Sequence, residues 1–98
     1  MKNINIWIDA DSCPSLVRNY VIKYSAKLSL PVFLVANKNI PCTEKSPFNM
    51  IICPEEKDAA DNYIFDNSTD TDLVITRDIV FADRLISKNV KPKINGKK

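Results

Sequence analysis

Histidine is absent from the 98-residue sequence, and glycine occurs once, as Gly96. The missing histidine excludes Ser-His-Asp and Cys-His catalysis, together with histidine metal sites. A single late glycine leaves no P-loop, dinucleotide fingerprint or nucleophile elbow near the first strands, because these turns need glycine. Carboxylates, hydroxyls, amides, lysine and arginine are the groups left for chemistry.

Paired cysteines and long apolar runs are also missing. Cys13, Cys42 and Cys53 form no C-x-x-C pair, so we expect buried thiols rather than disulfides or a zinc site. A nucleophilic Cys13 is a minority alternative, since it has no histidine partner. The first apolar run ends at Ile8 and is too short for a signal peptide or a membrane span. We therefore expect a soluble, cytoplasmic protein.

What is present is typical of one small globular domain. Hydrophobic residues make up 45% of the chain and charged residues 27%, with a formal net charge of +2. Much of the positive excess lies near the carboxyl end. We expect residues 1–90 to form the domain and residues 91–98 to be a basic, frayed tail, solvated rather than bound to nucleic acid.

The apolar pattern alternates between strand-like and helix-like segments. Strands are predicted at 4–9, 32–36, 49–53 and 72–76, with a possible fifth from Val90 that Pro92 disfavours; helices are predicted from Pro14 to Leu28, at 57–67 and at 79–88. In the first helix the stripe Leu16, Val17, Tyr20, Val21, Tyr24 and Leu28 is expected to be the buried face. This order predicts an α/β fold, a mostly parallel four- or five-stranded sheet with helices on both faces.

Acidic residues follow two of these strands. Asp9 closes the first strand, Asp11 lies in the turn after it, and Asp78 follows the fourth. Right-handed crossovers place these two strands side by side, with the ligand crevice at their carboxyl ends. Asp58 and Asp61 share one face of the second helix. Such a cluster favours Mg²⁺ or Mn²⁺, because a hard cation removes the repulsion and takes oxygen ligands.

Each candidate also has a simpler interpretation. Asp11 would serve as a cap of the first helix, and Asp58 would favour the start of the second. Asp83 is expected to be a solvated surface residue, and Thr76 to cap the third helix rather than bind substrate. The pattern leaves open whether Asn37 contacts substrate or closes a turn. It leaves equally open whether Arg77 pairs with a phosphate or with an aspartate.

Five motifs in order resemble the YaiI/YqxD family of uncharacterised bacterial proteins. They are Ile6-Trp7-Ile8-Asp9-Ala10-Asp11-Ser12-Cys13-Pro14, Leu34-Val35-Ala36-Asn37, Ser46-Pro47-Phe48, Asp58-Ala59-Ala60-Asp61-Asn62, and Asp72-Leu73-Val74-Ile75-Thr76 with Asp78-Ile79. The resemblance implies a PIN-like three-layer sandwich, similar to metal-dependent ribonuclease domains. Carried over to this chain, the metal ligands are Asp9, Asp61 and Asp78, with Asp11 as an added member. Val80 and Phe81 depart from the family pattern, and the chain resembles a shortened member or a fragment.

Three functions follow as hypotheses. The first is a nuclease-like domain that acts on RNA or another phosphodiester through Mg²⁺ or Mn²⁺, with Asp9, Asp11, Asp61 and Asp78 as catalytic residues and Asn37, Thr76 and Arg77 near the substrate. The second is a phosphatase of the haloacid-dehalogenase type, in which Asp9 is the nucleophile of a D-x-D motif. The third is a PIN-like binding or regulatory module without catalysis. The sequence leaves open whether the protein is an enzyme, and it does not specify an oligomeric state.

Overall fold

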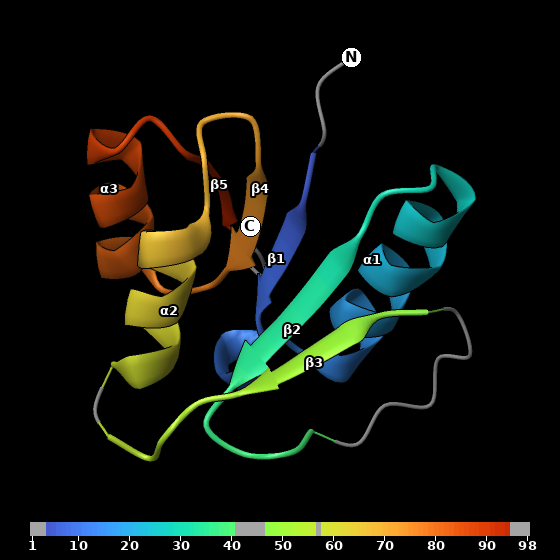
Figure 1. Ribbon diagram of the computed structural model, residues 1–98, viewed down its shortest axis with the longest axis horizontal. Coiled ribbons are helices and arrows are strands. Elements are labelled where there is room, and N and C mark those ends of the chain that lie inside the picture. Colours follow the sequence, from blue (N-terminus) through green and yellow to red (C-terminus); the bar gives the residue numbers. More distant parts are fainter. Residues whose placement is uncertain (1–3, 41–46, 57, 95–98) are drawn as a thin grey trace.

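In the part of the chain that the structure describes, five parallel strands form one sheet in the order β3-β2-β1-β4-β5 (Figure 1). The computed structural model describes residues 4–40, 47–56 and 58–94. Along the chain the elements are β1 (Ile6–Asp9), the 3-10 turn η1 (Ala10–Ser12), α1 (Ser15–Lys27), β2 (Val32–Ala36), β3 (Asn49–Ile52), α2 (Ala59–Asn67), β4 (Leu73–Thr76), α3 (Ile79–Ser87) and β5 (Lys91–Ile94). The expected α/β class and the central pairing of β1 with β4 are confirmed.

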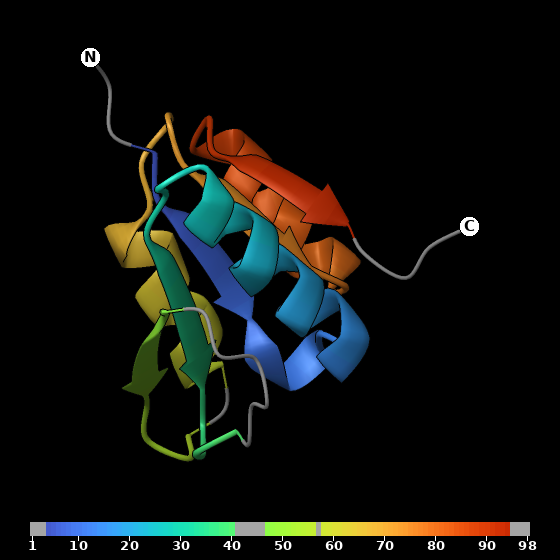
Figure 2. The same ribbon diagram turned by 90° about the vertical axis from the view of Figure 1, so that its right-hand side faces the viewer.

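The helices cover both faces of the sheet. In the view of Figure 2, α1 lies in front of the strands, and α2 and α3 lie behind them. The result is a three-layer sandwich, consistent with a PIN-like arrangement. From β1 the chain builds the sheet in one direction through β2 and β3, and it then adds β4 and β5 on the other side of β1. The crevice for a ligand is expected at this switch point, at the carboxyl ends of β1 and β4.

Alternation along β1 divides the core into two parts. Ile6 and Ile8 pack with Ile22 of α1, whereas Trp7 packs with Ile64 of α2 and the first two turns of α3. Side chains of successive strand residues point to opposite faces, so Asp9 emerges on the same face as Trp7. The strand therefore delivers the Asp9 carboxylate to the side covered by α2 and α3.

The buried face of α1 differs from the prediction. Ile22 and Ser25 are buried and Val17 and Val21 partly buried, but the remaining members of the expected stripe face solvent: Leu16, Tyr20, Tyr24 and Leu28. Two stripes at a spacing of four residues run side by side on this helix, and the prediction merged them. The stripe that lies one position further along, with Val17, Val21 and Ser25, is turned toward the sheet together with Ile22.

The carboxyl end of the described chain is a strand. Lys91–Ile94 pairs with β4, with Val74 opposite Pro92, so the sheet extends into the stretch expected to be a frayed tail. Pro92 is tolerated because β5 is an edge strand of this sheet. Residues 95–98 and Cys42 lie outside the described residues.

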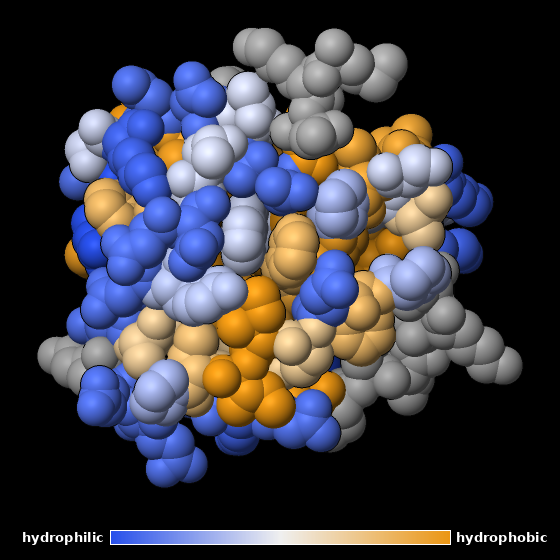
Figure 3. All heavy atoms as spheres, in the orientation of Figure 1, coloured by the Kyte–Doolittle hydropathy of each residue, from blue (hydrophilic) through white to orange (hydrophobic). Residues whose placement is uncertain are grey.

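The surface carries apolar side chains at the opposite edge of the sheet. In the view of Figure 3 they gather over β3, where Ile52 is exposed and Met50 and Ile51 are partly buried. Within the described ranges, no helix has both the length and the apolar character needed to cross a membrane.

Candidate active site

Five aspartates line one cavity of about 200 Å³ at the carboxyl ends of β1 and β4. Asp9 ends β1 and Asp11 lies in η1, whereas Asp78 immediately precedes α3. Asp58 precedes α2 and Asp61 lies in its first turn. Three separate segments of the chain thus bring acids to this crevice, and the meeting of Asp9 with Asp78 is the arrangement predicted from the strand order. Ser12, Asn37 and Ala60 complete the described lining.

Asp9 is the most deeply placed of these acids, with 4% of its surface exposed. Its Oδ2 accepts hydrogen bonds from the Thr76 hydroxyl at 2.9 Å and from the Ser12 hydroxyl at 3.0 Å. Burial raises the pKa of the Asp9 carboxyl, the two hydroxyls lower it, and the charges of Asp11 and Asp78 raise it further. The net shift is upward, so ionising Asp9 in this cavity costs free energy that a cation would offset.

The direction of both hydroxyl bonds is fixed by the backbone. The Thr76 oxygen accepts the Asp78 N–H at 3.0 Å, and the Ser12 oxygen accepts the Arg77 N–H at 3.3 Å. Because each hydroxyl already accepts an N–H, its own hydrogen is free to point at Asp9. Oδ2 is thereby occupied, and Oδ1 of Asp9 has no hydrogen bond from the described residues. One carboxylate oxygen is held by the protein and the other remains for a ligand.

Thr76 therefore has a different role from the helix cap that the sequence favoured. It is fully buried, and its hydroxyl lies between Asp9 and the Asp78 N–H. The cap of α3 is Asp78, whose Oδ1 accepts the Phe81 N–H at 3.1 Å. The prediction chose the wrong residue because Thr76 is still within β4, where its side chain points to the Asp9 face. Its contact with substrate stays a prediction.

Asp11 does not cap the first helix. The residue before α1 is Pro14, and no side chain caps the helix. Instead, Oδ2 of Asp11 accepts the backbone N–H of Asn37 at 3.0 Å, and the Asn37 amide donates to the Pro54 carbonyl at 2.8 Å. These bonds tie the turn after β1 to the ends of β2 and β3. Asp11 is exposed at the mouth of the cavity, and Asn37 is engaged in closing the adjacent loops.

Asp61 has a strongly raised pKa. Burial, and after it the charges of Asp9, Asp78 and Asp58, raise the pKa of its carboxyl to about 6 against an opposing effect of Arg84. Asp58 itself is exposed and has a left-handed backbone with φ of 62°, a conformation that aspartate tolerates better than most residues. Asp83 is exposed on α3 and takes no part in the cavity, as expected.

The raised pKa of Asp61 predicts a pH-dependent stability in the absence of metal. Between its ordinary pKa of 3.8 and its folded pKa of about 6, the folded chain holds a proton that the unfolded chain has released. Stability therefore falls as the pH rises through this window and stays reduced above it. We expect Asp61→Asn to melt at a higher temperature than the wild type at pH 7 in EDTA, with the gap closing toward pH 4.

Thermal melts between pH 4 and pH 8 measure this gap. Asp66→Asn is the matched control, because Asp66 is an exposed acid on the same helix, outside the cavity. If the melting temperatures of Asp61→Asn and wild type differ by the same amount at every pH, folding does not raise the pKa of the Asp61 carboxyl.

A second cavity, of about 560 Å³, adjoins the first. It shares Asp11, Ser12 and Asp78 with the acidic cavity and adds Cys13, Pro14 and Arg77. Arg77 is exposed there and makes no ion pair within the described part of the chain. Burial raises the pKa of the Cys13 thiol to about 11, so Cys13 is protonated at neutral pH and is unsuited to act as a nucleophile.

The acids are gathered but not closed around one point. In residues 4–40, 47–56 and 58–94, no three Asp, Glu or Cys side chains stand close enough together to hold a metal ion as placed. The donor chemistry still suits a hard divalent cation, because the cavity offers carboxylate oxygens, and burial together with their mutual repulsion raises the pKa values of Asp9 and Asp61. Asp9 also keeps one oxygen without a hydrogen bond from the described residues.

Sequence reasoning missed Ser12 as a site residue. It is not among the site residues predicted from the sequence, yet its hydroxyl holds Asp9 and links it to the backbone of Arg77. The signal was present in the spacing, since a hydroxyl three residues after a strand-ending acid returns to it through a 3-10 turn. The same return also brings the Ser12 hydroxyl within 3.3 Å of the Asp9 carbonyl oxygen.

The fold and the cavity define an all-parallel α/β domain with an acidic crevice at the ends of its two central strands. The chain belongs to the family described as "Uncharacterized BCR, YaiI/YqxD family", which matches residues 7–95. The resemblance drawn from the motifs is thereby confirmed at the level of the family.

The relatives carry names that state no activity. A "UPF0178 protein" of Geobacter metallireducens is 43% identical over 84 residues, 86% of this chain and 54% of the relative. Proteins of the same name from Trichlorobacter lovleyi and Treponema denticola are each 41% identical, over 87% and 89% of this chain and 55% of each relative. The chain thus spans about half the length of these relatives. No solved structure matches it.

Proposed function

We propose that the acidic cavity is a divalent-metal site and that the protein is a nuclease-like phosphodiesterase acting on single-stranded RNA or a related phosphodiester. One observation carries the proposal: five aspartates from three separate segments converge on one cavity at the switch point of the sheet. Helix capping explains an isolated acid after a strand, but it does not explain the gathering of five. The PIN-like resemblance of the motifs supports the same interpretation.

Asp9, Asp61 and Asp78 are the residues that would hold Mg²⁺ or Mn²⁺. When bound, such an ion supplies a water of lowered pKa and neutralises charge on a phosphate oxygen. Ser12 and Thr76 hold Asp9 in one orientation, so that its second oxygen faces the cavity. Asp78 is fixed through its cap on α3, which leaves its other carboxylate oxygen without a hydrogen bond from the described residues.

Two other groups are placed to handle substrate and water. Asp11 lies at the mouth with one oxygen held by the Asn37 N–H, and its free oxygen is suited to accept a proton from an attacking water. Arg77 lies in the adjoining cavity, where its guanidinium suits a phosphate of the bound chain. A substrate that spans both cavities would pass over their shared wall of Asp11, Ser12 and Asp78.

A binding or regulatory module without catalysis is the alternative that one specific observation supports. Because the acids are not closed around a point in the described residues, a PIN-like binding or regulatory module without catalysis fits the same geometry. The phosphatase alternative has less support, since no lysine is among the described lining residues to assist a phosphorylated Asp9. Trapping a phosphate on Asp9 would revive it.

The test is metal-dependent cleavage by the wild-type protein. We expect a labelled single-stranded RNA to be cut with Mg²⁺ or Mn²⁺ and to stay intact in EDTA, and we expect the same metals to raise the melting temperature by linkage. Asp83→Asn is the control, because it removes an exposed acid outside the cavity. If the metals change neither cleavage nor melting, the catalytic proposal is wrong and the binding module is favoured.

A further inference from the structure

The outward face of α1 is unusually apolar for a helix that faces solvent. Leu16 is 82% exposed, Tyr20 63% and Leu28 69%, and Tyr24 is also exposed. These residues are spaced by four, so they form one continuous stripe. This stripe is the face of α1 that points away from the sheet.

The stripe combines aromatic rings with positive charge. The rings of Tyr20 and Tyr24 have centroids 4.5 Å apart, and Nζ of Lys27 lies 4.8 Å and Nζ of Lys23 5.8 Å from the Tyr24 centroid. The helix contains no aspartate or glutamate, since its sequence is SLVRNYVIKYSAK. Its exposed face therefore offers two ring surfaces and two ammonium groups with no nearby acid on the same element.

The stripe also begins at the candidate active site. Cys13 and Pro14, which directly precede α1, line the cavity that contains Arg77 and shares its wall with the acidic cavity. From Leu16 to Lys27 the helix advances about 16 Å at its usual rise. A chain leaving the cavity beside Arg77 thus meets the two tyrosines and the two lysines within a few nucleotides.

We propose that this face of α1 binds single-stranded nucleic acid, with bases on Tyr20 and Tyr24 and phosphates at Lys23 and Lys27. This inference rests on the proposed function, whose substrate it extends along the surface. Stacking on aromatic side chains beside cations is how proteins hold single strands without reading their sequence. A second copy of the chain fits less well, because the same face of another α1 offers no aspartate or glutamate to pair with Lys23 and Lys27.

The experiment measures binding in EDTA, so that cleavage does not interfere. The probes are fluorescein-labelled oligouridine and oligothymidine of about 12 nucleotides, within the range that such sites occupy. We expect Tyr20→Ala with Tyr24→Ala to weaken binding about 30-fold or more, the loss of two stacked bases. Tyr20→Phe with Tyr24→Phe should retain affinity, because the rings remain. Lys23→Ala with Lys27→Ala should weaken binding. It should also make the negative slope of log association constant against log salt concentration shallower by about 1.4, the loss of two phosphate contacts.

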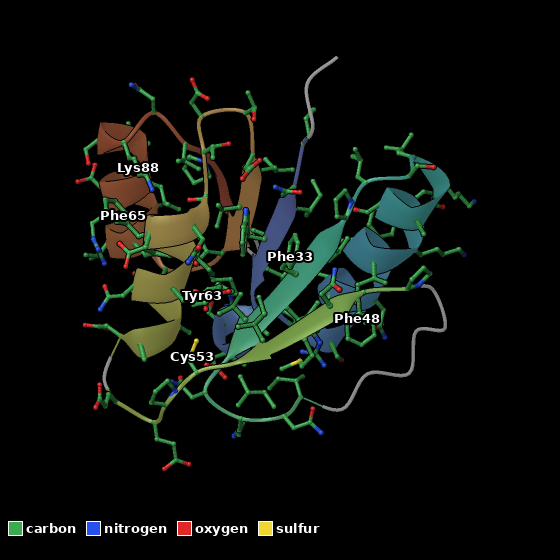
Figure 4. All side chains as sticks on the ribbon, in the orientation of Figure 1. Phe33, Phe48, Cys53, Tyr63, Phe65 and Lys88 are labelled. Atoms are coloured by element: carbon green, nitrogen blue, oxygen red, sulfur yellow. The ribbon has the colours of Figure 1, made fainter. Side chains whose placement is uncertain are left out.

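A matched control exists on the opposite side of the molecule. There the guanidinium of Arg84 lies 4.5 Å and Nζ of Lys88 4.9 Å from the centroid of Phe65, and Figure 4 shows Phe65 and Lys88 side by side. Arg84→Ala with Lys88→Ala removes the same charge from a similar ring and should leave affinity unchanged. All variants are compared after circular dichroism confirms that they are folded.

The outcomes separate this inference from the proposed function. If the α1 variants bind as tightly as wild type while wild type still cleaves, the inference is wrong and the nuclease proposal stands. If the α1 variants lose binding but no metal supports cleavage, the inference stands and the nuclease proposal fails. If the tyrosine variants instead change the sedimentation coefficient without changing affinity, the face joins two copies and the inference is overturned.

Discussion

Replacing Asp9 with asparagine should lower metal-dependent cleavage roughly 100-fold or more, the effect expected when one electrostatic group is removed from a reacting centre. The same change should leave the protein folded, and in EDTA near pH 7 it should raise the melting temperature. Asparagine keeps an oxygen that accepts from Ser12 and Thr76, but it removes a buried charge that burial and the charges of Asp11 and Asp78 make costly. Loss of activity with a gain of stability is the signature of an acid placed for function.

The two effects are measured on one preparation, by RNA cleavage and by thermal melting in EDTA. Asp83→Asn serves as the control, with no change expected in either quantity. Equal cleavage rates for Asp9→Asn and wild type would contradict the site. A fall in both activity and melting temperature would assign Asp9 a structural role instead.

Replacing Asp72 with alanine should destabilise the domain by about 3 kcal/mol, a fall in melting temperature of roughly 10 °C or more. Asp72 is 1% exposed at the amino end of β4, far from the cavity along the strands. Its Oδ2 accepts the Trp7 indole N–H at 3.0 Å and the Thr69 N–H at 3.1 Å, and its Oδ1 accepts the Asn5 N–H at 3.1 Å. Alanine would leave three donors without their acceptor, and a buried donor without a partner is expensive.

Trp7 provides the readout for this variant. It is the only tryptophan in the chain, and its ring stacks on Phe33 with centroids 4.6 Å apart, so its fluorescence should change when the Asp72 bond is lost. Asp72→Asn should be less damaging than Asp72→Ala, because the asparagine oxygen still accepts at one of the two carboxylate positions. It should be less stable than wild type, because its amide group faces a donor at the other position. Asp66→Ala, at an exposed acid, is the control. A melting temperature for Asp72→Ala within about 2 °C of wild type would refute this structural role.

Much of the fold was predictable because strand alternation and crossover handedness leave few topologies. Apolar runs ending in acids located β1 and β4, and the rule that crossovers are right-handed placed them side by side. The convergence of Asp9 and Asp78 on one cavity follows from that pairing alone. Asp61 was grouped with them through the family resemblance, and it lines the same cavity.

The remaining features depend on register and packing, which composition does not contain. Which of two adjacent stripes on α1 is buried depends on how the helix is rotated on the sheet, and the prediction merged the two stripes. The hydroxyl pair on Asp9 depends on Thr76 and Asp9 emerging on the same face of neighbouring strands. Asp72 gave no signal as a structural acid, because its three donors come from Asn5, Trp7 and Thr69, of which two are more than sixty residues away.

The most direct measurement is a crystal structure of the protein soaked in Mn²⁺, with anomalous scattering used to locate the ion. The account predicts an anomalous peak in the acidic cavity, with carboxylate oxygens of Asp9, Asp61 and Asp78 within bonding distance. It also predicts that the peak disappears in crystals of Asp9→Asn. A cavity that stays without an ion in wild-type crystals at millimolar Mn²⁺, or an ion bound elsewhere, would contradict the metal site on which the proposed function depends.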